Sequence, residues 1–217
     1  MGQKRTIIET LTSAQARLTD FTLFGIRISG RDYGHIANAV RNDQVLVVES
    51  LRMPSTMAMY NKALNCFTVG TQPTPSLIVH EATHAINDWH HRSVSGAVDE
   101  GICYVAQMIY VLRGNPAIQH AALSDQTLQN IHRYEGRCGQ RNEMPCNQAT
   151  IGHASRIAAV LRNGQTPDRQ MIADFERALG NDPFVLGATE TRVYNRINRM
   201  EIPRDYMTYW RGRIVDN

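Results

Sequence analysis

The chain has no long apolar run, no internal repeat and no low-complexity tract. A membrane-spanning helix needs about 20 consecutive apolar residues, and no segment approaches that length, so we expect no membrane partner. The N-terminal residues do not lead into a long apolar core, so no signal peptide is visible. We expect a protein that is cytoplasmic, or exported by a route that the sequence does not reveal. The 217 residues suit one domain over 1–217.

Lysine is nearly absent, since only Lys4 and Lys62 are present and arginine carries almost all the positive charge. The formal net charge is +3, which is too small to indicate a surface for an anionic polymer. No zinc-finger pairing or nucleic-acid-binding module accompanies the arginines, so we expect no nucleic-acid partner. They are expected to pair with acidic residues on helix surfaces, and they gather near the C-terminus at Arg192, Arg196, Arg199, Arg204, Arg211 and Arg213.

Cysteine is scarce, with four residues in the chain. Cys138 and Cys146 bracket a polar loop, and two interpretations stay open for them. They form a disulfide if the protein is exported, or two free thiols in a reducing cytosol. Cys66 and Cys103 are expected to be small core residues, and Cys103 is not counted as a metal ligand.

Residues 76–91 contain the pattern H-E-x-x-H in a segment that is expected to be helical. His80 and His84 are just over one helical turn apart, so both imidazoles project from one face and can share one metal ion. Glu81 then lies beside any water on that ion. A zinc hydrolase holds its metal and activates its nucleophile in this way.

Helical periodicity divides this segment into two faces. We expect Ser76 to be the N-cap and the helix to continue to His91. The stripe that includes both candidate ligands consists of His80, His84, Asn87 and His91. The opposite stripe, which is expected to anchor the helix in the core, consists of Ile78, Ala82, Ala85 and Trp89.

Residues 76–91, and more loosely the segments on either side, resemble the zincin superfamily of zinc metallopeptidases. The resemblance implies that His80 and His84 are Zn²⁺ ligands through ring nitrogens. It implies that Glu81 is the general base, which polarises the zinc-bound water and passes its proton to the leaving amine. The implied substrate is a peptide or protein.

A catalytic zinc ion needs a third protein ligand and an open position for water. His90 would fill that role in a metzincin-like pattern, with Asn87 at the position where that family has glycine. On an uninterrupted helix, however, His90 points about 80° away from the stripe of the two histidines. Nothing near Asn87 forces a break, so His90 is the less favoured candidate.

Glu100 is the favoured third ligand, because it is similar to the gluzincin arrangement in which a glutamate on a second helix completes the site. Tyr104 and Gln107 share its stripe, which suits a ligand and the polar groups that orient it. Asp99 is the alternative ligand if the register differs by one residue. Asp88 and His91 are candidates for orienting a ligand, but we expect both to be surface groups.

The predicted fold class is α+β and zincin-like, with a small antiparallel or mixed sheet packed on the H-E-x-x-H helix and a mainly helical C-terminal half. We divide it into an α+β part with an edge hairpin (1–75), two metal-binding helices (76–114) and a helical part (115–217). In small zincins such an edge strand pairs with extended substrate. The expected strand is 44–49 and the hairpin strands are 57–60 and 66–70. The expected helices are 4–19, 33–42, 76–91, about 100–113, 117–134, 149–162, 168–179, 186–199 and 204–212.

The leading function is therefore a zinc-dependent metallopeptidase that hydrolyses peptide bonds through a Glu-activated, zinc-bound water. One alternative is a zinc-binding regulatory or interaction module without physiological proteolysis, and another is a secreted or delivered metallopeptidase effector. A group that stabilises the oxyanion is also needed. The candidates are Tyr104, which is favoured, and His132, Tyr134 and His153.

Overall fold

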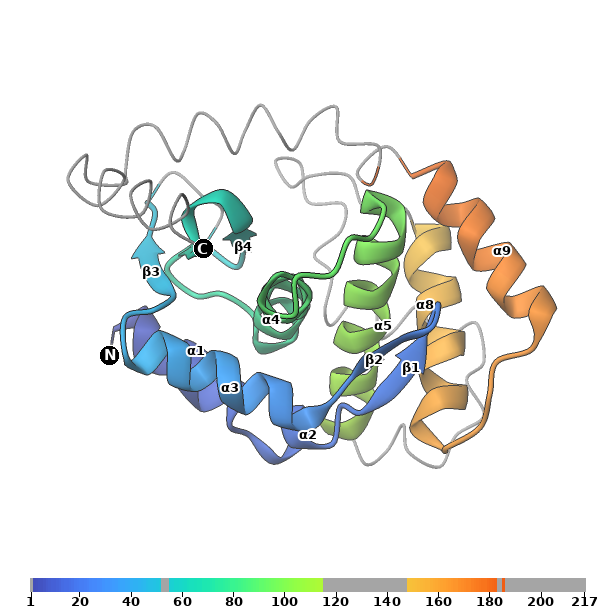
Figure 1. Cartoon of the computed structure of the whole chain (residues 1–217), viewed down its shortest axis with the longest axis horizontal. Coiled ribbons are helices and arrows are strands. Elements are labelled where there is room, and N and C mark those ends of the chain that lie inside the picture. Colours follow the sequence, from blue (N-terminus) through green and yellow to red (C-terminus); the bar gives the residue numbers. More distant parts are fainter. Residues whose placement is uncertain (1, 52–54, 115–147, 183–184, 186–217) are drawn as a thin grey trace.

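Two helices, α4 (Pro75–Trp89) and α5 (Gly96–Gly114), cross at the centre of the fold (Figure 1). The computed structural model describes residues 2–51, 55–114, 148–182 and 185. In this part of the chain the fold class is α+β, as predicted, with helices and two small sheets. No helix among the described residues is long and apolar enough to cross a membrane.

α4 begins one residue before the expected N-cap and ends before His91. Thr74 is the N-cap and Pro75 takes the first helical position, where the missing N–H of proline costs nothing. Ser76 is buried inside the first turn, so the prediction that it is the N-cap is wrong. His90 caps the C-terminus and His91 has a left-handed φ of 51°, which ends the helix.

The apolar stripe of α4 faces the core as predicted, except at its last residue. Ile78, Ala82 and Ala85 are buried, whereas Trp89 is 47% exposed. Trp89 is the last residue of α4, and its exposure shows that the prediction that it anchors the core is wrong.

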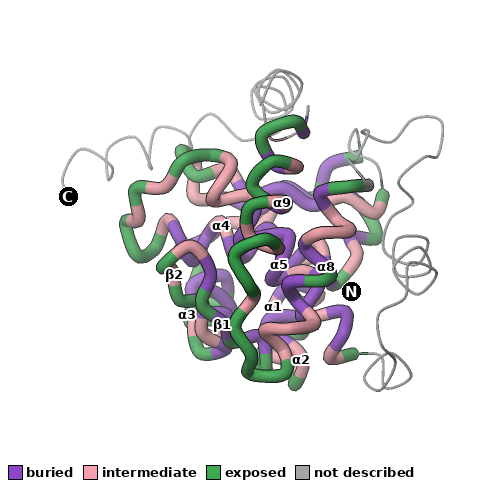
Figure 2. The backbone as a smooth tube through the Cα atoms, turned by 90° about the vertical axis from the view of Figure 1, so that its right-hand side faces the viewer, coloured by how far each residue is buried: buried purple, intermediate pink, exposed green. Residues whose placement is uncertain are grey.

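α5 is buried on nearly all sides, because it contacts α4 on one face and α8 (Gln148–Arg162) and α9 (Arg169–Gly180) on the other. Figure 2 shows α9 lying over α5 with its outer surface exposed. The two helices approach closely at Gly101, where an added Cβ would lie 2.8 Å from the side chain of Leu179. The glycine next to Glu100 thus lets α9 hold that turn of α5 firmly.

The expected helix over 4–19 is two helices, α1 (Gln3–Leu11) and α2 (Ala14–Arg17). The break is local, because the Ser13 hydroxyl accepts a hydrogen bond from the Ala16 N–H and begins a new helix. α3 (Gly30–Arg41) starts earlier than the expected 33, at a capping box formed by Ser29 and Asp32.

A short antiparallel hairpin, β1 (Phe21–Leu23) and β2 (Ile26–Ile28), was not predicted. Phe24 and Gly25 form its turn with φ values of 51° and 76°. Positive φ at both central residues matches the twist of a two-residue hairpin. The Phe24 ring stacks on that of Phe175 in α9, which gives the turn residue a packing partner.

The predicted strands form a mixed sheet in the order β3-β5-β4. β3 (Leu46–Glu49) is parallel to β5 (Cys66–Val69), and β4 (Ala58–Asn61) is antiparallel to it, with η1 (Lys62–Leu64) between the hairpin strands. The predicted hairpin is confirmed. β4 is an edge strand and packs against α4, so the sheet lies on the H-E-x-x-H helix as expected.

The helices expected over 149–162 and 168–179 are confirmed as α8 and α9, and Asp168 caps α9 through the Met171 N–H. The helices expected over 117–134, 186–199 and 204–212 lie outside the described residues.

We expect Gly30→Ala to lower the free energy of unfolding by roughly 2 kcal/mol or more. An added Cβ would lie 1.9 Å from the Arg17 carbonyl oxygen, and only a backbone shift could relieve that contact. The matched control is Gly34→Ala in the same helix, where nothing lies within 4 Å of the added Cβ.

The control should leave stability unchanged or raise it by up to about 1 kcal/mol, because alanine is the better helix former. Urea titration followed by circular dichroism measures both. Equal midpoints for the two variants would contradict the close approach of α2 to α3.

Candidate metal centre

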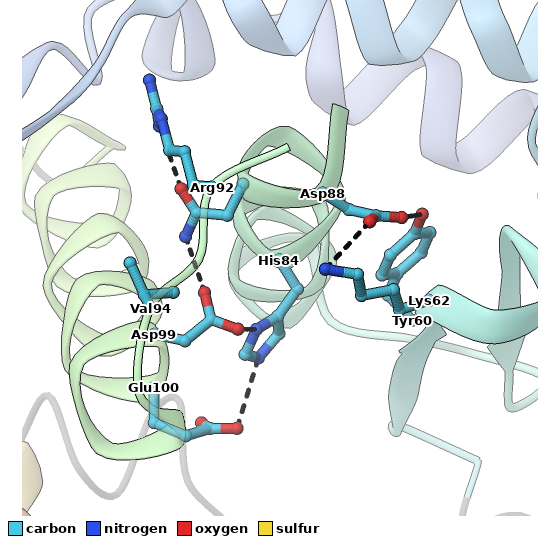
Figure 3. A pocket seen from close by; sticks show the side chains of 9 residues that line it. Tyr60, Lys62, His84, Asp88, Arg92, Val94, Asp99 and Glu100 are labelled. Atoms are coloured by element: carbon cyan, nitrogen blue, oxygen red, sulfur yellow. Dashed lines mark hydrogen bonds and ion pairs between the residues drawn. The ribbon is translucent and has the colours of Figure 1, made fainter. Parts of the chain in front are cut away.

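His80 and His84 lie on the buried side of α4, with ring centroids 5.2 Å apart. The Glu100 carboxylate of α5 faces both rings. Its Oε2 lies 3.3 Å from His80 Nε2. Its Oε1 lies 3.3 Å from His84 Nε2 (Figure 3). The structure therefore brings together the three residues that the sequence nominated as ligands.

Each of these 3.3 Å distances matches a nitrogen–oxygen edge of a zinc site, with the two histidines contacting different oxygens of Glu100. Zn²⁺ binds imidazole nitrogen and carboxylate oxygen at about 2.0–2.2 Å in a tetrahedron, whose edges are then about 3.3–3.5 Å long. Glu100 Oε2 is buried and receives no hydrogen bond in the described part of the chain. A buried carboxylate oxygen without a donor is costly, and a metal ion would satisfy it. Two imidazoles and one carboxylate are also ligands that zinc prefers.

The other nitrogen of each imidazole is held by a polar side chain of α5. His84 Nδ1 lies 2.8 Å from Asp99 Oδ2, and His80 Nδ1 lies 3.2 Å from Gln107 Oε1. Asp99 also accepts a hydrogen bond of 2.6 Å from the Asn87 amide. Because an acceptor lies beside Nδ1 of each ring, the proton of the neutral imidazole sits on Nδ1 and Nε2 is free to bind a metal, as at known zinc sites. Asp99 therefore orients the His84 ring, and its carboxylate lies on the Nδ1 side of that ring and not beside Nε2.

The ionisation of these groups favours a positive charge between the two helices. Burial lowers the pKa of His84, but Cys103, Glu100 and Asp99 outweigh burial and hold that pKa well above its usual value. Burial raises the pKa of Glu100, but the two histidines outweigh it and hold the pKa of that carboxyl below its usual range. Glu100 is therefore a carboxylate.

Glu81 is buried beside this cluster, and its Oε2 accepts a hydrogen bond of 2.7 Å from the Tyr60 N–H of β4. Burial raises the pKa of Glu81 above its usual value. A buried carboxylate with a raised pKa is a stronger base than an exposed one, which suits a group that takes a proton from water.

A pocket of about 290 Å³ opens beside His84 and Glu100 (Figure 3). Asp88 is part of the pocket wall. It accepts a hydrogen bond of 2.8 Å from the Tyr60 hydroxyl and lies 3.2 Å from the Lys62 ammonium. Asp88 therefore ties the edge strand to α4 and is more than a surface group. The lining residues are Tyr60, Lys62, His84, Asn87, Asp88, Arg92, Val94, Asp99 and Glu100.

Tyr60 is a residue of this region that the sequence did not indicate. It binds α4 at two points, through its N–H to Glu81 and through its hydroxyl to Asp88. No motif marks it, because it belongs to a strand whose position against α4 is a tertiary property.

His90 points away from the cluster. Its Nε2 lies 3.1 Å from Asp32 Oδ1 on α3, because α4 is uninterrupted through Asn87. This structure therefore does not bring His90 together with His80 and His84, as the metzincin-like alternative requires. His91 is exposed beyond the end of α4, as expected for a surface group.

Among the candidates for stabilising an oxyanion, Tyr104 packs edge-on against the His80 ring, with centroids 4.9 Å apart. Burial and Arg156 lower the pKa of His153 of α8, and the other charges that act on it are Asp174 and Arg177 of α9, so it belongs to another surface. His132 and Tyr134 lie outside the described residues, as do Cys138 and Cys146.

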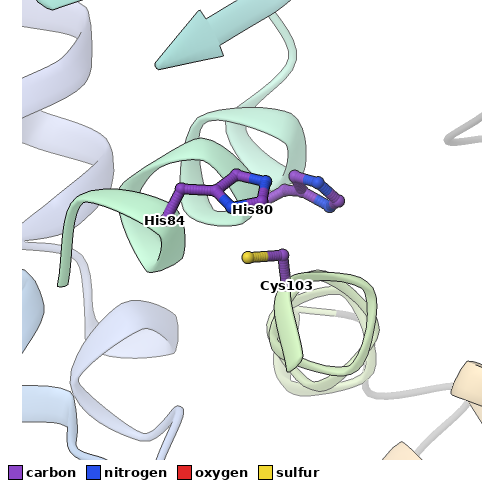
Figure 4. Close-up of side chains that lie close together, drawn as sticks. All are labelled: His80, His84 and Cys103. Carbon is purple, nitrogen blue, oxygen red and sulfur yellow. The ribbon is translucent and has the colours of Figure 1, made fainter. Parts of the chain in front are cut away.

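Cys103 requires a correction. It is buried, as expected for a core residue, but its Sγ and the ligand nitrogens of His80 and His84 all lie within 4.8 Å of one another (Figure 4). Its position off the helical stripe of Glu100 had argued against a role as a metal ligand. Residues three apart on a helix differ by only about 60°, however, so both can face the same neighbour.

Comparison with models of protein families, with curated proteins and with solved structures found no match for this chain. The chemical interpretation therefore depends on the residues of the site.

We expect Asp99→Asn to weaken Zn²⁺ binding by about 10- to 100-fold, because an amide holds the His84 Nδ1–H less strongly than a carboxylate does. Competition with a fluorescent zinc chelator measures the affinity. Asp43→Asn, at an exposed carboxylate paired with Lys4, is the control and should bind zinc as the wild type does. Equal affinities for both variants would show that Asp99 does not support a ligand.

Proposed function

We propose that this protein is a zinc-dependent metallopeptidase with a zincin-like fold and a gluzincin-type ligand set of His80, His84 and Glu100. The observation that carries the proposal is the Glu100 carboxylate, which lies 3.3 Å from the Nε2 atom of both histidines. The Nδ1 contacts to Asp99 and Gln107 support it, because they leave both Nε2 atoms available.

Zn²⁺ held by these residues would supply a Lewis acid that polarises a peptide carbonyl and acidifies water. Glu81 takes the proton from the attacking water and returns it to the leaving amine. The Tyr60 N–H holds one carboxylate oxygen of Glu81 and fixes the direction of the other. The low polarity around Glu81 strengthens it as a base.

The edge strand β4 is where we propose that the substrate backbone binds. The Met57 carbonyl accepts a hydrogen bond from the Gly70 N–H. The backbone N–H and C=O groups of odd-numbered residues of β4 therefore point toward β5, and those of even-numbered residues point outward. The Tyr60 N–H points outward to Glu81, and the N–H and C=O of Ala58 point to the same side. An extended peptide that pairs with this edge would pass beside Glu81.

We expect Glu100→Ala to hold less zinc than the wild type and His90→Ala to hold as much as the wild type. Glu100 faces both histidines, whereas His90 contacts Asp32 on the far side of α4. Metal analysis of the purified proteins after gel filtration gives the zinc content. Zinc that stays with Glu100→Ala and leaves His90→Ala would reverse the choice of the third ligand.

We expect Glu81→Gln to retain zinc and to lower kcat for peptide cleavage by about 10²- to 10⁴-fold, because the amide cannot accept the proton. Cleavage of a quenched-fluorescent peptide library, with and without a chelator, measures it. The control is Glu176→Gln on the exposed surface of α9, which should leave cleavage unchanged. A Glu81→Gln protein with wild-type activity would contradict the proposed general base.

A second candidate is a zinc-binding module without physiological proteolysis. The position of Cys103 beside both imidazoles favours it, because four protein donors leave no open position for water. Under this alternative the wild-type protein holds zinc but cleaves no peptide of the library.

A further inference from the structure

Cys103 and Glu100 are one turn apart on α5, and both face the histidines of α4. Figure 4 shows the thiol directed toward the two imidazoles, and the side chain is fully buried. The second helix therefore offers two donors to the same space, one carboxylate and one thiol.

The thiol is close enough to share a metal ion with the histidines. Two donors on one zinc ion lie at most about 4.4 Å apart, since Zn–S is about 2.3 Å and Zn–N about 2.1 Å. Sγ of Cys103 and the nitrogens of His80 and His84 lie within 4.8 Å of one another without a metal. In a tetrahedral site these donors lie about 3.4–3.6 Å apart, so side-chain movements of up to about 1 Å would bring all three within bonding reach.

A buried cysteine is usually a small core residue, and Cys66 of β5 is an example in this chain. The Cys66 thiol donates to the carbonyl of its neighbour Phe67, 3.4 Å away, and belongs to no cluster of metal-binding side chains in the described residues. Cys103 instead lies against His80 and His84. Cys66 is therefore a matched control for Cys103.

We propose that Cys103 is a fourth protein ligand, whose thiolate occupies the position that a catalytic zinc ion needs for water, so that the resting site is closed. The inference rests on the metal site of the proposed function but not on peptide hydrolysis. On binding, the S–H bond is replaced by a metal–sulfur bond and the proton leaves to solvent. Hydrolysis then requires release of the thiolate or a fifth coordination position.

A thiolate ligand changes which metals the site prefers. Thiolates are soft donors that favour Zn²⁺ and Cd²⁺, whereas carboxylate and water favour Mn²⁺. Loss of a group that merely orients a ligand costs about 10- to 100-fold in affinity, so Cys103→Ala should weaken Cd²⁺ binding at least that much. Mn²⁺ binding should change little, and Cys66→Ala should change neither.

The deciding experiment loads the full-length protein with Co²⁺ and records its near-ultraviolet and visible spectrum, which needs no enzymatic activity. A cysteine ligand gives an intense thiolate-to-cobalt charge-transfer band that histidine and carboxylate do not give. The proposal predicts this band in the wild type and in Cys66→Ala, and its loss in Cys103→Ala. X-ray absorption at the cobalt edge of the wild type detects the sulfur neighbour without any variant.

The wild type could bind one Co²⁺, and lose it in His80→Ala, but show neither the band nor a sulfur neighbour. That result would overturn the role of Cys103 and leave the metal centre standing. A band that persists in Cys103→Ala would also overturn it. No Co²⁺ binding to the wild type would contradict the metal centre itself, and the thiolate ligand with it.

Discussion

The contact between α4 and α5 is the constraint on which the candidate site depends. Two histidines from one helix and a carboxylate from the other meet in a largely buried layer, where an unpaired charge costs several kcal/mol. Without a metal ion, the two histidines stabilise the ionised form of Glu100 and lower the pKa of its carboxyl against the effect of burial. A divalent cation does the same with more charge and satisfies the oxygen that has no donor. The fold thus maintains a buried space suited to a cation.

The surrounding elements hold this contact in place from both sides. α9 presses against α5 at Gly101, next to Glu100, and β4 is tied to α4 by the two hydrogen bonds of Tyr60. α3 adds a buried hydrogen bond between the Tyr33 and Thr83 hydroxyls, one residue before His84. Groups that must keep their positions to within about 0.5 Å need rigid support of this kind.

The sequence was sufficient where a feature depends on local periodicity. The spacing of His80 and His84 and the helical stripe of Glu100 identified residues that do meet, and the hairpin before α4 was recovered. The break at Ser13 and the turn at Phe24 were missed, because one capping hydroxyl and a Phe-Gly pair are weak signals beside a helical pattern. Tyr60 and Cys103 could not be placed because their roles depend on how closely β4 and α5 approach α4.

An anomalous difference map at the zinc edge, from crystals of the zinc-loaded protein, tests the central claim most directly. The account predicts one strong peak between α4 and α5, within bonding distance of Nε2 of His80, Nε2 of His84 and the Glu100 carboxylate. A peak bound elsewhere, or full zinc loading without a peak between these helices, would contradict it.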